Sequence, residues 1–445
     1  MNHEPKRVFS RAASTPTVSR LAVIAFACLA LVALAAKAYL TARNVSRLGA
    51  LDQADFNLFY YAFDTVAHHL PDIGKLYDRA YLLERLHALG TPIAPENDAF
   101  FGYPPQFAVL LSPLAALGLQ AAKCLWVTIS GVLLLVSLAM LTVLCVPKSS
   151  NRRVRFYLFA LGLAALSAPL YAEIQFGQSN CLILFLVSSM LWLRYERGNS
   201  WLAGVPIGIA IIFKLSPAVI LLPFLIRKDW RLVVSAGVVA LAGTVATALV
   251  TGSGLLIRYL TEALPALTHQ ALGSGPAPWN SSFRGALSRV AADLSLSVPD
   301  ALIGGLSSVY GLAVIALVAF VTWRSSPNRH RDMALATMLP LLVSPVVERH
   351  HVLLALVPIL ATAAVLGTRL AALNDRAGGS IVSRERHVLR VDMALLGLVV
   401  LAMTVNPIWI SYYVAIVLLF VTVLRTGQAW APIASLHTDT VSPAV

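Results

Sequence analysis

The residues best suited to chemistry begin with an acidic and aromatic run at residues 55–61, which reads DFNLFYY. Asp55 is ionised at neutral pH unless it is strongly desolvated, so it could act as a general base. The aromatic rings beside it, including Tyr60 and Tyr61, offer apolar faces of the kind that contact a sugar ring. The alternative is that Asp55 caps the following helix while the aromatic side chains form the apolar face of that helix.

A second polar run, EIQFGQSN, occupies residues 173–180 between two apolar stretches. Gln178 and Asn180 can both donate and accept hydrogen bonds, as contacts with sugar hydroxyl groups require. The alternative is an ordinary polar turn between two membrane spans. Gln178 and Asn180 are therefore candidate substrate-binding residues.

A third run, PWNSSFRGALSR at residues 278–289, adds an amide and two cations. Asn280 could contact the hydroxyl groups of a sugar, and Arg284 could pair with a phosphate through two parallel hydrogen bonds. The alternative is an amphipathic helix whose arginines lie at lipid headgroups. Both interpretations stay open.

The fourth run, SPVVERHHVLLA at residues 344–355, places charged groups between two apolar stretches. Charges this close to hydrocarbon are costly and are usually functional or paired. His350 and His351 are adjacent, but no third ligand stands at a recognisable spacing, so contacts with phosphate or hydroxyl groups are favoured over zinc and no metal is predicted. Lys214, within IIFKLSP, could balance a buried acid, hold an anionic headgroup or extend to water.

Composition indicates the kind of protein that must position these residues. The chain has 445 residues, of which 58% are hydrophobic and 12% charged, about half the charged fraction of a soluble domain. Apolar runs near the roughly 20 residues needed to cross a bilayer recur along the chain. We therefore expect an all-α polytopic membrane protein with about 10–12 transmembrane helices and a helical first outer loop at residues 42–103.

The placement of basic residues predicts the orientation. The net charge of +13 would suggest a nucleic-acid partner in a soluble protein, but no such partner is expected here. Basic residues cluster in the tail at residues 1–20 and in alternate connections, at residues 148–155, 194–197, 227–231, 324–331 and 369–390. The positive-inside rule assigns these segments to the cytoplasm. All four polar runs then lie on the extracytoplasmic face of the plasma (inner) membrane.

Three apolar stretches are irregular. Residues 104–146 are too long for one helix, and a half-helix or an interfacial helix leading into a span from about Lys123 fits best. Residues 201–226 begin and end on the basic side, so we expect two short helices that meet at a break near Lys214. Residues 391–424 are expected to form two short passes that turn at Asn406 and Pro407.

Taken in order, the motifs DFNLFYY, GKLYD, FGYPPQFAVLLSPLAAL, FGQSN, AGVPIGIAIIFKLSP, WNSSFRGALSR and SPVVERHH resemble glycosyltransferase family 87. The resemblance implies a GT-C fold, with one transmembrane catalytic domain at residues 21–425 between cytoplasmic tails at 1–20 and 426–445. It implies that Asp55 is the catalytic acid of the family and that His350 and His351 match its paired histidines. The residues before the histidines, Val347, Glu348 and Arg349, depart from the pattern of the family, which has an aromatic residue and a single charge there.

The resemblance also implies an activity. Members move a sugar from a polyprenyl monophosphate carrier to a lipid-linked or cell-envelope glycan, without a nucleotide sugar or another cofactor. Mannosyl and arabinofuranosyl transfer are both known, and mannose is favoured here. The alternatives are a transporter or flippase of lipid-linked sugars, because breaks in spans also occur there, and a non-catalytic subunit. We expect the outer loops to converge on one cavity bordered by Asp55, Gln178, Arg284 and His350.

Overall fold

The structure is a computed structural model that describes residues 53–94, 100–148, 150–267, 279–374, 380–404 and 411–427. All regular elements within these residues are helical, which confirms the all-α prediction. The α-helices in chain order are α2 (Ala54–His68), α3 (Arg79–Ala88), α4 (Pro105–Leu111), α5 (Leu119–Cys145), α6 (Ser150–Leu166), α7 (Ala168–Phe176), α8 (Asn180–Tyr195), α9 (Ser200–Phe213), α10 (Leu222–Ile226), α11 (Trp230–Thr251), α12 (Ser253–Arg258), α14 (Phe283–Asp293), α15 (Asp300–Arg324), α16 (Arg329–Val343), α17 (Leu356–Asn374), α18 (Ser380–Thr404) and α19 (Ser411–Gly427). The remaining elements are the 3₁₀ helices η1 (Leu70–Lys75), η2 (Ser112–Ala116), η3 (Ser216–Leu221) and η5 (Arg349–Ala355), and the π-helix η4 (Tyr259–Ala263).

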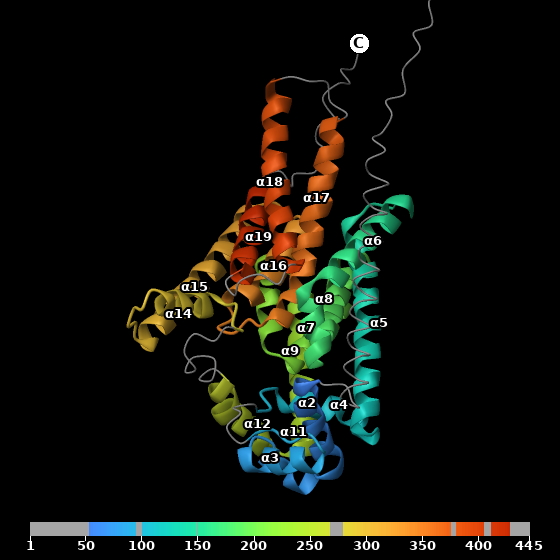
Figure 1. Cartoon of the computed structure of the whole chain (residues 1–445). Coiled ribbons are helices and arrows are strands. Elements are labelled where there is room, and N and C mark those ends of the chain that lie inside the picture. Colours follow the sequence, from blue (N-terminus) through green and yellow to red (C-terminus); the bar gives the residue numbers. More distant parts are fainter. Residues whose placement is uncertain are drawn as a thin grey trace, which may run out of the picture.

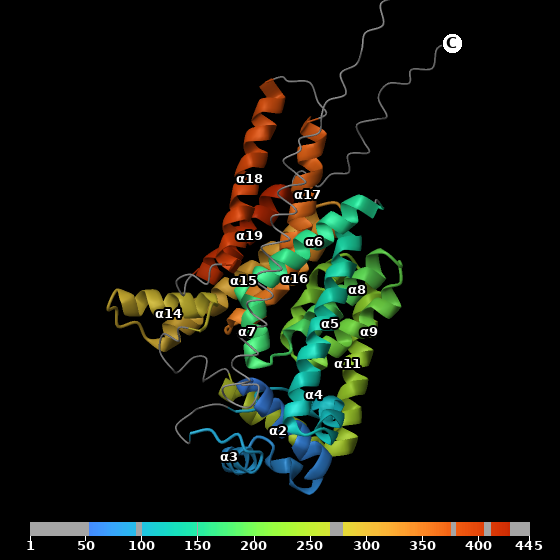
Figure 2. The same ribbon diagram turned by 45° about the vertical axis from the view of Figure 1, so that its right-hand side comes forward.

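The helices form an elongated bundle with different elements at its two ends. Figures 1 and 2 show α2, α3 and α12 together at one end, while α17 and α18 extend to the other. Within the described residues, five helices are long and apolar enough to cross a membrane, or six if the bent pair α6–α7 counts as one span. Five further apolar helices have 10–17 residues. The chain is therefore a multi-pass membrane protein. The apolar run at residues 21–40, which its length and the basic tail before it predict to be the first span, lies outside the described residues.

Local sequence signals explain where several helices begin. Asp78 accepts a hydrogen bond from the backbone N–H of Tyr81 at the start of α3, and Ser167 does the same for Leu170 at the start of α7. Asn328 likewise caps α16. Each of these side chains satisfies a backbone donor that the first turn of a helix leaves without a partner.

Two of the irregular stretches have the expected form. Residues 104–146 contain α4 and η2 and then the 27-residue helix α5, which confirms a short helix leading into a span. The stretch 201–226 is broken at Lys214, where α9 ends and η3 begins two residues later with Pro217 in its first turn. Of residues 391–424, residues 391–404 belong to α18 and 411–424 to α19, and the turn expected at Asn406 and Pro407 lies outside the described residues.

Close packing holds the broken span against α11. The glycines Gly204 and Gly208 stand four residues apart on α9 and face α11. A side chain at Gly204 would collide with Ser235, and a Cβ atom at Gly208 would lie 2.8 Å from the carbonyl oxygen of Ala236. Small residues at this spacing let two membrane helices approach closely, so α9 has a rigid support just before its break.

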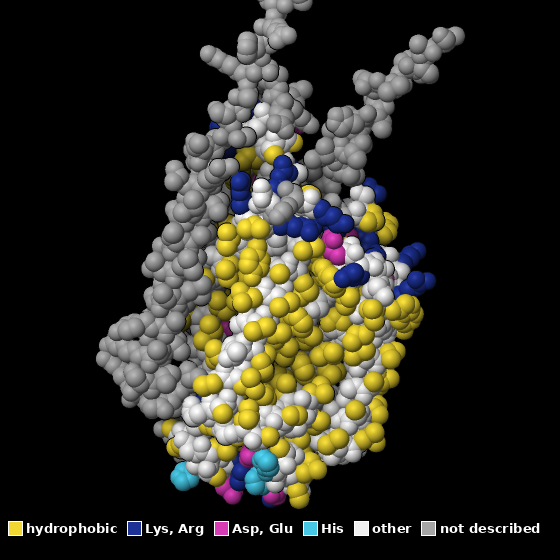
Figure 3. Space-filling model, turned by 90° about the vertical axis from the view of Figure 1, so that its right-hand side faces the viewer, with side chains coloured by type: hydrophobic (Ala, Val, Ile, Leu, Met, Phe, Trp, Pro, Cys, Tyr) yellow, Lys and Arg dark blue, Asp and Glu magenta, His cyan; other side chains and the backbone are white. Residues whose placement is uncertain are grey.

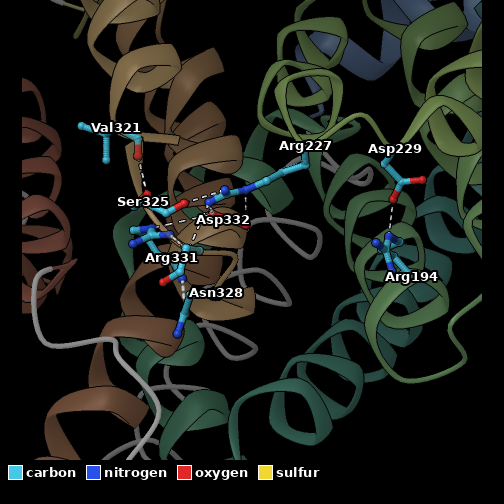
Figure 4. Close-up of polar contacts among 9 residues, drawn as sticks. Arg194, Arg227, Asp229, Val321, Ser325, Asn328, Arg331 and Asp332 are labelled. Atoms are coloured by element: carbon cyan, nitrogen blue, oxygen red, sulfur yellow. Dashed lines mark hydrogen bonds and ion pairs between the residues drawn. The ribbon is translucent and has the colours of Figure 1, made fainter. Parts of the chain in front are cut away.

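Ion pairs connect neighbouring helices at one end of the bundle. Arg227 on the α10–α11 connection pairs with Asp332 of α16 at 3.1 Å, and Arg194 of α8 pairs with Asp229 (Figure 4). Figure 3 shows Lys and Arg side chains gathered near this end, with a wide hydrophobic band between it and the opposite end, where acidic and histidine side chains lie. Large apolar side chains are also exposed on α11 and α15, such as Leu249 and Leu312.

The run at residues 173–180 differs from the expected loop. Glu173 lies within α7, Asn180 is the first residue of α8, and only Gly177, Gln178 and Ser179 separate the two helices. The turn is this short because Gly177 adopts a left-handed conformation with φ 68°, which ends α7 abruptly.

Candidate functional site

A cavity of about 420 Å³ lies where several distant parts of the chain meet. Its wall includes the first turn of α2, the turn between α7 and α8, the break after α9 and the segment that leads into η5. Of the candidates from the sequence, Asp55, Gln178, Asn180, His350 and His351 line it. The further polar residues of the lining include Tyr103, Lys214 and Glu348.

Asp55 is held in the wall by one strong contact. The side-chain Nε2 of Gln178 donates a hydrogen bond to Asp55 Oδ2 at 2.5 Å. Burial raises the pKa of Asp55 above its ordinary value, while the hydrogen bond from Gln178 and the charge of Lys214 oppose this rise. A carboxylate with a raised pKa and an open face is suited to accept a proton.

The orientation of the Gln178 amide follows from its other partner. Tyr103 donates its hydroxyl hydrogen to Gln178 Oε1 at 3.1 Å, which leaves the amide NH₂ group to face Asp55. The indole Nε1 of Trp126 donates to the backbone carbonyls of Gly177 at 3.0 Å and Gln178 at 3.1 Å. The turn that carries Gln178 is thus fixed from α5, and its side chain is fixed by Tyr103.

Asn180 borders the cavity but already uses its amide group. Its Nδ2 donates to Glu173 Oε2 at 2.9 Å, and the backbone N–H of Cys181 donates to Glu173 Oε1 at 2.8 Å. Glu173 is only 1% exposed. These contacts tie the end of α7 to the start of α8, so Asn180 stabilises the turn that presents Gln178.

Glu348 and His351 form a reciprocal pair of hydrogen bonds at the start of η5. The backbone N–H of Glu348 donates to His351 Nδ1 at 3.0 Å, and the Glu348 side chain accepts from the backbone N–H of His351 in return. This reciprocal cap satisfies two backbone donors at once. Burial, followed by the charge of Asp55, raises the pKa of Glu348 to about 7.

The two histidines have different surroundings. His351 Nε2 lies 2.6 Å from Lys214 Nζ. His350 is 2% exposed, and its Nε2 lies 3.8 Å from Glu348 Oε2. The two rings meet edge to face with centroids 4.5 Å apart. His351 is thus coupled to a cation and His350 to a carboxylate.

Tyr60 and Tyr61 lie in α2 but not in the cavity wall described by the structure. The hydroxyl of Tyr60 donates to the carbonyl of Leu117 at 2.6 Å, and that of Tyr61 to the carbonyl of Leu76 at 3.1 Å. Leu58 and Phe59 line the cavity instead. Residues three and four positions after Asp55 share its face of the helix, whereas Tyr60 and Tyr61 point elsewhere.

Asn280 and Arg284 also lie away from the cavity lining. Asn280 Nδ2 donates to the carbonyl of Pro345 at 3.0 Å, and its Oδ1 accepts from the backbone N–H of Val347 at 3.1 Å. Arg284 is 6% exposed and lies against α15, where a Cβ atom at Gly304 would be 2.9 Å from its Nη1. The expectation that Arg284 borders the cavity is therefore not met, because α14 directs this side chain toward α15.

Asn280 still matters to the site, in another way. Together with the backbone of Ser281, which donates to the carbonyl of Val347 at 2.6 Å, it clamps the segment that leads to Glu348. Asn280 is therefore a positioning residue of the cavity wall.

Three residues of the cavity wall were not among the site residues predicted from the sequence. Lys214 and Glu348 had a visible signal, since each is a charge at an apolar stretch, but their partners lie far away in the chain. Tyr103 lies in FGYPP directly before α4, and the prolines that begin α4 are the signal that the chain changes direction there.

Several proteins of known activity resemble this chain. It is 28% identical over 285 residues to a polyprenol-phosphate-mannose-dependent alpha-(1-2)-phosphatidylinositol pentamannoside mannosyltransferase of Mycolicibacterium smegmatis, covering 62% of each chain. It is 31% identical over 266 residues to a polyprenol-phosphate-mannose-dependent alpha-(1-2)-phosphatidylinositol mannoside mannosyltransferase of Mycobacterium tuberculosis, covering 56% of this chain and 59% of that one. An alpha-(1->3)-arabinofuranosyltransferase of Corynebacterium glutamicum is 26% identical over 225 residues, half of each chain.

These similarities span about three fifths of the length of the two mannosyltransferases. No solved structure matches the chain. The sequence model of glycosyltransferase family 87 matches residues 100–345, which contain Tyr103, Gln178 and Lys214 of the cavity wall. Because this match covers more than half of the sequence and the fold is a multi-pass helical bundle of the GT-C kind, the chain belongs to glycosyltransferase family 87.

Proposed function

We propose that this protein moves a hexose, with mannose favoured, from a polyprenyl monophosphate carrier to a lipid-linked or cell-envelope glycan acceptor. The observation that carries the proposal is Asp55, which faces a cavity among membrane helices and is held there by an oriented Gln178. A cavity of about 420 Å³ falls in the size range of pockets that hold small ligands.

In the proposed reaction, the acceptor hydroxyl gives its proton to Asp55 as its oxygen forms a bond to the anomeric carbon of the donor. The bond from that carbon to the phosphate oxygen breaks, and its electron pair leaves with the phosphate. The polyprenyl phosphate that departs gains one negative charge. The site therefore needs a base on one side of the sugar and a positive group on the other.

The bundle supports an extracytoplasmic site. α11 begins beside the pair Arg194–Asp229 at the basic end and continues into α12, where Arg258 donates to the carbonyl of Gly74 at the opposite end. The positive-inside rule assigns the basic end seen in Figure 3 to the cytoplasm. On this basis we place the amino terminus in the cytoplasm, the protein in the plasma (inner) membrane, and Asp55 toward the outer face.

The relatives guide the choice of substrates. The two mycobacterial relatives are named for polyprenol-phosphate-mannose and for phosphatidylinositol mannosides. The corynebacterial relative transfers arabinofuranose, so an arabinose carrier is the second candidate donor.

A donor comparison tests the proposal. Purified protein in nanodiscs receives labelled polyprenyl-phosphate mannose, polyprenyl-phosphate arabinose or GDP-mannose, together with a phosphatidylinositol mannoside extract. We expect a new labelled glycolipid only with the mannose carrier. Transfer from the arabinose carrier alone would replace the sugar, and transfer from GDP-mannose alone would refute the donor class. In sealed proteoliposomes, movement of intact carrier across the bilayer without a new glycosidic bond would support a flippase.

The pH dependence of transfer should follow Asp55. Its base form is required, so activity falls as pH drops through its pKa, and burial places this loss above the ordinary range of an aspartate. The hydrogen bond from Gln178 lowers that pKa, so Gln178→Met should move the acid limb of kcat/KM to higher pH. Gln106→Met is the matched control, because Gln106 bonds Thr244 outside the cavity lining. An unmoved acid limb in Gln178→Met would contradict the assignment of Asp55 as the titrating base.

A further inference from the structure

The cavity contains a cation that suits the departing phosphate. Among the described residues of its wall, Lys214 is the only lysine or arginine. Arg284 packs on α15, and Arg289 donates through Nη2 to the carbonyl of Asn280 at 2.5 Å. The positive group that the reaction needs must therefore be sought at Lys214.

We propose that Lys214 and the Nε2–H group of His351 together bind the phosphate of the donor and hold it as it leaves. The proposal rests on the proposed function and names the phosphate subsite of the same cavity. α9 ends at Phe213, and Lys214 has an extended backbone with φ −154°. The break in the span is thus the feature that turns this side chain out of the helix and into the cavity wall.

Lys214 and His351 bring two nitrogen atoms to one point of the cavity wall. His351 Nδ1 accepts the backbone N–H of Glu348, so in the neutral ring the hydrogen is on Nε2. An ammonium group has only donors. Lys214 Nζ and His351 Nε2 lie 2.6 Å apart, so one phosphate oxygen beside them would accept a hydrogen bond from each.

The subsite is linked to the base through a chain of contacts. Lys214 Nζ lies 5.7 Å from the centre of the Tyr103 ring, and the Tyr103 hydroxyl donates to Gln178, which in turn donates to Asp55. The carboxyl groups that interact electrostatically with the Lys214 ammonium group are those of Glu348, Glu173 and Asp55. Tyr103 and Gln178 thus connect the phosphate subsite to the base within the lining of one cavity.

Apolar residues next to Lys214 fit the rest of the carrier. Leu215 and Pro217 follow it in the break, and Leu264 and Leu267 line the same cavity. A prenyl chain is purely apolar, so a phosphate held at Lys214 would have hydrocarbon contacts available beside it.

The test compares a charged and an uncharged lipid. Wild-type protein in nanodiscs is titrated with a long-chain polyprenyl phosphate and with the matching polyprenol, and binding is measured by native mass spectrometry. Lys214→Met should weaken polyprenyl phosphate binding by about tenfold to a hundredfold, the range expected for hydrogen bonds to charged groups. Polyprenol binding should stay within about twofold of wild type, since the apolar contacts remain.

Further variants separate charge from folding. Lys214→Arg keeps the cation and should retain most of the phosphate affinity, whereas Lys214→Gln should lose it. Lys75→Met is the control, because Lys75 is an exposed residue paired with Asp72 on η1. In transfer assays, Lys214→Arg should change KM for the donor less than Lys214→Gln does.

The outcomes distinguish the two proposals. Equal phosphate binding by wild type and a folded Lys214→Met, or equal loss in the Arg and Gln variants, would overturn the phosphate subsite while wild-type transfer still supported the glycosyltransferase. Wild-type protein that neither prefers the phosphate over the polyprenol nor transfers sugar would refute the proposed function itself.

Discussion

Asp55→Asn is expected to slow sugar transfer by about a hundredfold to ten-thousandfold, the usual cost of losing a general base. The amide keeps the size of the carboxyl group, and its oxygen can still accept the hydrogen bond that Gln178 donates to Asp55. The α2 cap does not depend on Asp55, because the helix begins after Gln53 without a side-chain cap. The variant should therefore fold and bind donor while transfer is lost.

Asp72→Asn provides the matched control for this prediction. Asp72 lies in the same outer segment, but its side chain is 43% exposed and pairs with Lys75 rather than facing the cavity. Transfer is measured with saturating donor, and folding is checked by thermal unfolding in detergent. A folded Asp55→Asn protein that turns over as fast as Asp72→Asn would exclude Asp55 as the base.

Gly177→Ala should damage both the stability of the protein and its activity. A left-handed conformation such as φ 68° costs a residue with a side chain about 1–2 kcal/mol. The new Cβ atom would also lie 2.7 Å from Phe56 Cβ and 3.0 Å from Gln53 Cβ, so α2 and the α7–α8 turn must move apart. Since this turn carries Gln178, the contact with Asp55 would shift, and a displacement of about 1 Å can reduce a rate by about a hundredfold.

Gly198→Ala isolates the contact from the backbone effect. Gly198 has a similar φ of 62°, and no atom lies within 4 Å of the added Cβ. Thermal unfolding and transfer rates are measured for both variants. We expect a lower Tm in each and a large loss of transfer only in Gly177→Ala. Similar transfer by the two variants would show that the approach of α2 to the turn is not needed for activity.

Much of the architecture follows from local properties of the sequence. Apolar runs, capping residues and prolines act over a few positions, and they predicted an all-helical membrane protein, the break at Lys214 and the short helix before α5. The turn at Gly177 shows where local reasoning falls short. The polar residues of the run 173–180 suggested a loop. Most residues of this run are helical instead, because buried Glu173 accepts hydrogen bonds from Asn180 and Cys181 and so joins the end of α7 to the start of α8.

In the site, too, some features follow from the local sequence and others only from tertiary packing. The sequence by itself determined which polar groups stand next to apolar spans. Of the four residues it predicted around one cavity, Asp55, Gln178 and His350 line the cavity in the structure. Only the tertiary structure decided which way each side chain points: Tyr60 and Tyr61 pack away from the cavity, while Arg284 lies against α15. The contact of Lys214 with His351 joins positions 137 residues apart, and such a contact depends on how whole helices pack, which no local pattern encodes.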